Sequence, residues 1–329
     1  MTKAKSLKCS RVWSKSDPVS ASLTLAPRVN SSQAHRRFLV RFLVTALLVT
    51  LLASSAQAAS SLFTTEFGST TLGRAWRFSV YLPDGYETSG LRYPVLYLLH
   101  GRGDSETSWA TGGKIKSVLD AAIASGEIPP TIAIMPAAGS SWYVDSTEKI
   151  ETAFIKDLIP RVDASYRTIQ ARNGRALAGY SMGGYGALRY ALAYPELFGV
   201  ATLLSAALYD ADPPEDSSAR ELPVFGAPFD LTRWSALNYP KMLESFLPKK
   251  LSLPIFIAAG DDEYINTRYR DNAEVQAVEL YARLRKAGQR AQVRIYNGGH
   301  DWTVWSPAFA EGLRYMFAYL ARPELPAPK

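Results

Sequence analysis

The segment that most constrains this chain is Arg175–Leu188, which reads as a short strand, a sharp turn and a helix. Its centre, Gly179-Tyr180-Ser181-Met182-Gly183, is a Gly-x-Ser-x-Gly pattern. Glycine on both sides of the serine suits a crowded, strained turn that lifts the serine hydroxyl above a sheet. The helix that follows points its free N–H groups toward the place where negative charge would develop. The pattern therefore predicts that Ser181 is a nucleophile on an α/β scaffold.

The first 58 residues differ in character from the rest of the chain. Basic residues that end at Arg41 precede an uncharged, largely apolar run at 42–53, and small residues follow up to Ala58. This order is typical of a secretory signal peptide. The apolar run has twelve residues, whereas a membrane-spanning helix needs about 20. We expect export to the periplasm or the medium, with an uncleaved N-terminal anchor as the alternative.

Composition narrows the chemistry of residues 59–329. They carry 28 basic and 29 acidic residues, a formal charge of −1, so the basic balance of the whole chain comes from the leader. We therefore expect no nucleic-acid partner, and no membrane partner after cleavage. The single cysteine, Cys9, lies in the leader, and only His100 and His300 remain beyond it. Metal sites built on several cysteines or histidines are excluded, and we expect no metal and no cofactor.

Strands that alternate with helices predict an α/β fold with a mostly parallel central sheet and helices on both faces. Several strands are continuously apolar, which is typical of strands buried on both sides. The expected strands are 62–67, 74–82, 93–99, 131–136, 175–180, 199–205, 253–259 and 291–296. The expected helices are 115–125, 148–164, 273–287 and 307–320.

The regular rhythm stops at 207–250, a segment with many prolines that opens on an acidic run. We interpret it as an insertion in a single catalytic domain that comprises residues 59–329. Two readings stay open for it. It is either a cap or wall over the substrate, or a solvated connection without a binding role.

Polar groups follow several of these strands, at the edge where open α/β sheets form their active sites. In chain order they are His100-Gly101-Arg102, Ser181, Asp261-Asp262-Glu263 and His300. Serine, acid and histidine appear in the chain order of α/β-hydrolase triads. His300 is the predicted base, since a neutral imidazole accepts a proton from a serine near neutral pH. A carboxylate would fix its tautomer.

The acid and the oxyanion hole complete the predicted site. A Gly-x-x-acid spacing after the strand favours Glu263 as the acid, and Asp262 is the alternative. His100 precedes a glycine-bearing loop. This position is more typical of the strand whose backbone forms the oxyanion hole than of a catalytic base. We expect the backbone N–H groups of Arg102 and Met182 to receive the developing oxyanion.

Four motifs carry a resemblance to a known family. They are His100-Gly101 with Trp109 downstream, Ser141-Trp142-Tyr143, the segment 179–184, and Gly298-Gly299-His300-Asp301-Trp302. Over about residues 60–320 the chain resembles the esterase D family of α/β-hydrolases, which includes feruloyl, acetyl-xylan, tributyrin and enterobactin esterases, S-formylglutathione hydrolases and mycolyltransferases. The resemblance implies oxyanion donors at Arg102 and Met182. Family members often have aspartate at the acid position, where this chain offers Glu263.

The expected function is an exported serine carboxylesterase that forms an acyl-enzyme on Ser181. Its partner would be a small-molecule or polysaccharide-linked ester, with Trp109, Trp142, Tyr180 and Trp302 as candidate pocket residues. An acyltransferase with a sugar or alcohol acceptor would use the same triad. A non-catalytic, hydrolase-like binding protein is a third hypothesis.

Overall fold

The computed structural model describes residues 59–209, 212–263 and 272–326. The predicted leader at 1–58 lies outside the described residues. Within the described ranges, no helix is both long and apolar enough to span a membrane.

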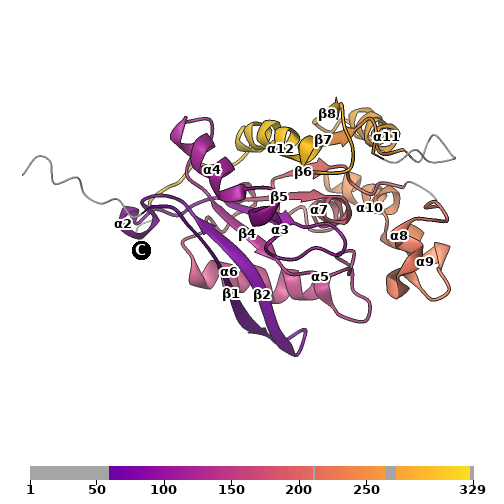
Figure 1. Ribbon diagram of the computed structural model, residues 1–329, viewed down its shortest axis with the longest axis horizontal. Coiled ribbons are helices and arrows are strands. Elements are labelled where there is room, and N and C mark those ends of the chain that lie inside the picture. Colours follow the sequence, from indigo (N-terminus) through magenta and orange to yellow (C-terminus); the bar gives the residue numbers. More distant parts are fainter. Residues whose placement is uncertain (1–58, 210–211, 264–271, 327–329) are drawn as a thin grey trace, which may run out of the picture. The chain divides into compact units, whose positions relative to one another are not determined.

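The centre of the fold is an eight-stranded sheet in the order β1-β2-β4-β3-β5-β6-β7-β8 (Figure 1). Its strands are β1 (Ser61–Ser69), β2 (Arg74–Leu82), β3 (Val95–Leu99), β4 (Ile132–Pro136), β5 (Arg175–Tyr180), β6 (Val200–Leu204), β7 (Ile255–Gly260) and β8 (Ala291–Tyr296). The hairpin β1–β2 is antiparallel and joins β4 in the same sense. All remaining pairs are parallel. The α/β prediction is confirmed, and the predicted strands match the observed ones closely.

Helices cover both faces of this sheet. The helices are α2 (Tyr86–Ser89), α3 (Ser108–Thr111), α4 (Ile115–Ala124), α5 (Ile150–Ala153), α6 (Ile159–Ser165), α7 (Met182–Ala193), α8 (Ser218–Glu221), α9 (Leu231–Leu237), α10 (Tyr239–Phe246), α11 (Ala273–Lys286) and α12 (Trp302–Phe317). In β3, alternate side chains enter opposite cores. Tyr97 and Leu99 pack in the core that includes residues of α6, α7, α10 and α11. Leu98 packs in the core that includes residues of α4 and α12.

Two helices differ from the sequence prediction. The helix expected over 148–164 is interrupted by a π-helical turn at Phe154–Leu158, between α5 and α6. The last helix begins at Trp302, five residues before the expected start, and Pro307 lies inside it. The Asp301 side chain caps that helix by accepting a hydrogen bond from the Thr303 N–H. Proline lacks only one N–H, so a well-capped helix that packs on the sheet tolerates Pro307 near its beginning.

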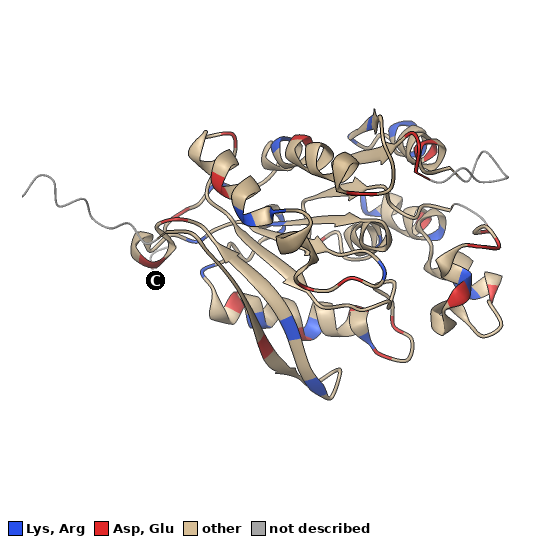
Figure 2. Ribbon diagram, viewed as in Figure 1, with Lys and Arg blue, Asp and Glu red and all other residues tan. Residues whose placement is uncertain are grey.

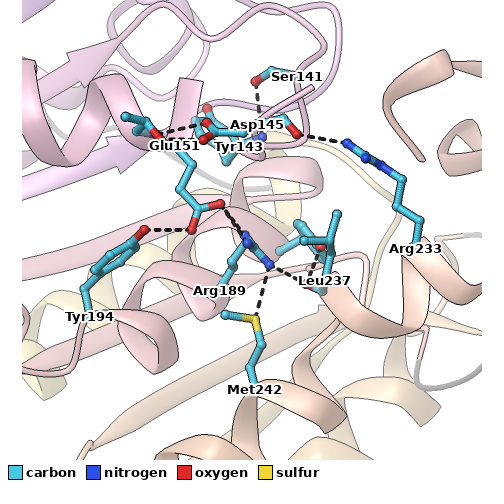
Figure 3. Close-up of polar contacts among 11 residues, drawn as sticks. Ser141, Tyr143, Asp145, Glu151, Arg189, Tyr194, Arg233, Leu237 and Met242 are labelled. Atoms are coloured by element: carbon cyan, nitrogen blue, oxygen red, sulfur yellow. Dashed lines mark hydrogen bonds and ion pairs between the residues drawn. The ribbon is translucent and has the colours of Figure 1, made fainter. Parts of the chain in front are cut away.

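The second half of segment 207–250 is tied to the sheet. Its helix α10 packs against α7, and Trp234 and Phe246 are fully buried. Figure 3 shows a polar anchor beneath it, in which Arg189 of α7 forms an ion pair with Glu151 of α5 at 2.7 Å. The same guanidinium donates to the Leu237 backbone oxygen at 2.6 Å. This part of the segment is therefore structural core and not a solvated connection.

Four of the inner strands carry no charged side chain, and β5 carries one, Arg175, which pairs with Asp163. Figure 2 shows both signs distributed over the helices and loops of the described chain. Strands β3, β4, β6 and β7 contain no Lys, Arg, Asp or Glu. Buried strands without charge avoid the cost of taking an ionised group out of water.

Candidate active site

Ser181 lies in the turn between β5 and α7, with φ 55° and ψ −123°. Its N–H donates to the Leu204 carbonyl at 2.9 Å, which links the turn to the next strand. Both flanking glycines are sterically required. A Cβ on Gly179 would lie 2.1 Å from the Gly183 oxygen, and a Cβ on Gly183 would lie 2.2 Å from the Leu99 oxygen. A positive φ in a residue other than glycine is costly and occurs mostly where the surrounding structure enforces it.

Glu263 and His300 meet at the carboxyl ends of β7 and β8. The imidazole Nδ1–H of His300 donates to Glu263 Oε2 at 2.8 Å. The Glu263 side chain is fully buried, whereas His300 retains 18% exposure. Asp262, the alternative acid, is exposed. The Asp261 carboxylate instead accepts the Gly298 N–H. Of the three consecutive acids, Glu263 is the one whose side chain contacts the imidazole.

A pocket of about 430 Å³ gathers the predicted chemical groups. Ser181, Met182, Arg102, Glu263 and His300 all line it. Its size falls in the range of small-molecule sites. Met182 is the first residue of α7, so its N–H belongs to the helix N-terminus, where N–H groups have no partner within the helix. The described residues contain no group of three or more His, Cys, Asp or Glu placed to bind a metal ion.

The four predicted pocket aromatics divide into two pairs. Trp142 and Tyr180 line the pocket. Trp109 and Trp302 are not among its lining residues and pack against Tyr180, with ring centroids at 5.4 and 4.9 Å. Trp109 is fully buried. This pair supports the pocket from beneath, because Tyr180 lies between it and the cavity.

Tyr180 connects the aromatic cluster to the loop after β3. Its hydroxyl donates to Asp104 at 2.6 Å. Burial, together with this hydrogen bond to a carboxylate, raises the pKa of Tyr180 well above its ordinary value. The phenol therefore stays protonated and serves as a fixed donor in the pocket wall. Gly101 has to be small here, since a Cβ would lie 2.8 Å from the Tyr180 ring.

Segment 207–250 supplies one wall of the pocket. Its contribution comes from the part before α9 and consists of Ala207, Leu208, Tyr209, Pro214, Asp216, Ser217, Ser218 and Glu221. Glu221 pairs with the Arg102 side chain at 2.9 Å, and both groups are exposed. An exposed pair of this kind contributes about 0–1 kcal/mol. The pair therefore bridges the two sides of the pocket without locking them together.

His100 is held as a neutral ring. The imidazole is buried, its Nδ1–H donates to the Gly101 oxygen at 2.7 Å, and its Nε2 accepts the Ala138 N–H at 2.9 Å. Because Nε2 accepts a hydrogen bond, it carries no proton. Burial lowers the pKa of His100 from its ordinary value. Both nitrogens are occupied by the backbone, so this histidine shapes the loop that carries Arg102.

We expect the free energy of unfolding to fall less steeply with decreasing pH in His100→Gln than in the parent protein. An unfolded histidine titrates near about 6.5, and the folded state resists that proton because the pKa of His100 is lowered. Stability from this group is therefore complete above that pH and is lost below it, by up to about 1.4 kcal/mol per pH unit. Urea unfolding of both proteins at pH 7.5 and 5.5 measures the difference. Equal declines would show that other groups carry the effect.

Two pocket residues that contact Glu263 or His300 are absent from the sequence prediction. Ser205 directly follows β6 and Trp305 lies in α12, and both line the cavity. Ser205 carries a signal that the sequence offered, because it follows a continuously apolar strand just as Ser181 does. Trp305 carries none, since its approach to His300 depends on where α12 begins.

Several known proteins are similar to this chain. A family model described as Putative esterase matches residues 69–316. A Xylanibacter ruminicola protein named endo-1,4-beta-xylanase/feruloyl esterase is 37% identical over 163 residues, which cover 46% of this chain and 22% of that protein. An esterase of Mycobacterium tuberculosis is 32% identical over 266 residues, which cover 71% of this chain and 54% of the relative. The chain thus spans about half, or less, of the length of these two relatives.

A solved structure extends the likeness to three dimensions. A ferulic acid esterase superposes with a TM-score of 0.67 at 30% identity, over 80% of this chain and 99% of that one.

Proposed function

The chain belongs to the esterase family whose model spans residues 69–316, and we propose that it is a serine hydrolase that cleaves carboxylic esters through an acyl-enzyme on Ser181. The observation that carries the proposal is the Glu263–His300 hydrogen bond in the same pocket as the strained Ser181 turn. A serine esterase needs a nucleophile, a base and a group that orients the base. Ser181, Glu263 and His300 are residues of the required types, and they occur in the required chain order.

The proposed reaction has two halves. In the first, Ser181 Oγ attacks the ester carbonyl carbon while His300 Nε2 accepts the hydroxyl proton. The resulting imidazolium then protonates the alcohol oxygen as the carbonyl–oxygen bond breaks. In the second half, water attacks the acyl-enzyme with His300 as base, and the imidazolium returns the proton to Ser181 Oγ as the free acid leaves. Glu263 stabilises the imidazolium in both halves and keeps its own charge.

The oxyanion is assigned to backbone donors. Met182 presents its N–H at the beginning of α7, and Arg102 lines the same pocket. N–H groups fixed before the reaction need no rearrangement when charge develops on the carbonyl oxygen. The Arg102 side chain is engaged with Glu221, so the proposal uses only its backbone.

The substrate class follows from the relatives and the pocket together. Two of the similar proteins are named for feruloyl ester cleavage, and the cavity has room for an aryl acyl group beside Trp142 and Tyr180. We therefore place esters of aromatic or short acyl groups, free or attached to a polysaccharide, first among its substrates. Methyl ferulate, p-nitrophenyl acetate and longer p-nitrophenyl esters form the panel that orders them.

A fluorophosphonate probe tests the mechanism. We expect one probe molecule per chain, on the peptide that contains Ser181, because the probe reacts with an activated serine and mimics the tetrahedral intermediate. Ester hydrolysis that persists after Ser181 is completely labelled would refute the assignment. Product analysis with added alcohol separates hydrolysis from acyl transfer, since a transferase yields mainly the new ester.

Export is part of the proposal and rests on the leader sequence alone. A basic region, a short apolar run and small residues precede residue 59. The proposal requires a mature N-terminus near Ala59 in protein recovered outside the cytoplasm. An intact N-terminus at Met1 on cell-associated protein would contradict it.

A further inference from the structure

We propose that Ser205 is a positioning residue that fixes the Glu263 carboxylate in the orientation His300 requires. The inference rests on the proposed function, because it assigns a role within that site. Ser205 belongs to none of the groups usually needed for ester cleavage, and it touches the acid from the side opposite the imidazole.

Ser205 occupies a turn that resembles the one at Ser181. It directly follows β6, as Ser181 directly follows the neighbouring strand β5, and its φ is 44°. Its N–H donates to the Ala258 oxygen of β7 at 2.7 Å, which ties it to the strand that leads to Glu263. The residue is 2% exposed. A strained backbone at a buried polar residue is maintained only where the surrounding contacts determine it.

The direction of every hydrogen bond around the Ser205 hydroxyl is fixed by chemistry. The indole Nε1–H of Trp305 can only donate, and it donates to Ser205 Oγ at 2.8 Å. The ionised Glu263 carboxylate can only accept, so the single hydroxyl proton of Ser205 goes to its Oε1. The only proton of the hydroxyl is thus directed at the carboxylate. This arrangement makes Ser205 a donor to the acid and leaves it unsuited to be a second nucleophile.

The two carboxylate oxygens consequently have separate partners. Oε1 accepts both the Ser205 hydroxyl and the Gly260 N–H, whereas Oε2 faces His300 Nδ1. Rotation of the carboxylate would break two hydrogen bonds to a buried, charged group, which is costly. Ser205 and Gly260 therefore hold Oε2 toward the imidazole before substrate arrives.

Trp305 joins this arrangement to the rest of the pocket. Its ring stacks on Tyr180 at 4.5 Å and meets the His300 ring edge-on at 5.1 Å. One side chain thus supports the imidazole by packing and the acid through Ser205. Displacement of the indole would affect both members of the pair.

We test the inference with Ser205→Ala and Ser205→Gly, measured on p-nitrophenyl acetate from pH 5 to 9. Both variants lose the hydroxyl, but only glycine also relieves the positive φ. We expect kcat to fall about 10- to 100-fold in both, with KM nearly unchanged, as for a lost hydrogen bond to a charged group. The acidic limb of the kcat/KM profile should move to higher pH, because a carboxylate with fewer donors favours the protonated imidazole.

Thr202→Val provides the matched control. Thr202 lies on β6, is fully buried, and its hydroxyl has no hydrogen-bond partner among the described residues. The variant removes a buried hydroxyl from the same strand, and we expect wild-type rates and an unmoved pH profile. The other charged groups in or next to the site are the same in all three variants: Arg102, Asp104, Asp216, Glu221, Asp261, Asp262 and Asp301. A shift of the pH profile in the Ser205 variants is therefore assigned to the missing hydroxyl.

The outcomes separate this inference from the proposed function. If both Ser205 variants keep the kcat and the acidic limb of the parent, the positioning role is overturned. Ester hydrolysis by the parent protein would still leave the proposed function intact. Activity that follows thermal stability, with glycine and alanine differing, would assign Ser205 a structural role and also overturn it. Absence of ester hydrolysis in the wild type would refute the proposed function, and the positioning role with it.

Discussion

Replacing Ser181 by alanine is expected to lower kcat for p-nitrophenyl acetate by about 10⁴-fold or more, the effect typical of losing a triad nucleophile. The turn should persist, because its constraints come from Gly179, Gly183 and the Leu204 carbonyl. Alanine has no hydroxyl to attack the ester, so only stabilisation of charge by the backbone donors remains. Initial rates at saturating substrate give the comparison.

Ser125→Ala is a suitable control for this prediction. Ser125 is exposed at the end of α4 and donates only to a carbonyl of its own helix. We expect its rate to equal that of the wild type. Thermal unfolding of both variants should coincide with the parent to within a few degrees. A Ser181→Ala protein that folds normally and hydrolyses the ester at the parent rate would refute the acyl-enzyme mechanism.

The second large effect is expected for Glu263→Gln, at about 10³- to 10⁴-fold in kcat. Glutamine has nearly the same size but is neutral, so it neither stabilises an imidazolium nor dictates that His300 Nδ1 carries the proton. The buried position adds to the loss, because Ser205 and Gly260 both donate to this carboxylate. Measurements of kcat and KM should place the defect in kcat.

Asp262→Asn is the matched variant. It makes the same change from acid to amide in the adjacent residue, whose side chain is exposed. We expect activity within about two-fold of the wild type, as for most surface substitutions. A large loss in Asp262→Asn together with a mild one in Glu263→Gln would reverse the assignment of the acid.

Local patterns predicted the fold and the Ser181 turn, because the residues involved are constrained by neighbours close in the sequence or on the adjacent strand. Gly179 and Gly183 are required by contacts within one turn and the strand beside it, so the five-residue pattern carried the information. The continuously apolar strands likewise indicate burial on both faces of the sheet. His300 was predicted because only two histidines follow the leader and His300 is the one that comes after the serine and the acids in the chain.

The remaining site features depend on contacts between distant segments. The Gly-x-x-acid spacing favoured Glu263 and left Asp262 open, whereas the structure shows the contacts that hold Glu263 inward: its carboxylate accepts from Ser205, Gly260 and His300. No local pattern in the sequence predicts the contacts with Ser205 and His300. Trp109 illustrates the same limit, because its aromatic character indicated a pocket and only the position of Tyr180 shows that it packs behind one.

The anchor at Arg189 has a consequence for how such a protein can diversify. Arg189 and the Tyr185 hydroxyl both donate to the Leu237 backbone oxygen, so removing α9 would leave a buried charge without one of its acceptors. The part before α9 includes the residues that face the cavity, but its Phe225 is fully buried and packs against Tyr185 of α7. We therefore expect the cavity-facing residues before Phe225 to change as ester specificity changes. Phe225, α9 and α10 have to be inherited together with the helix that follows the nucleophile.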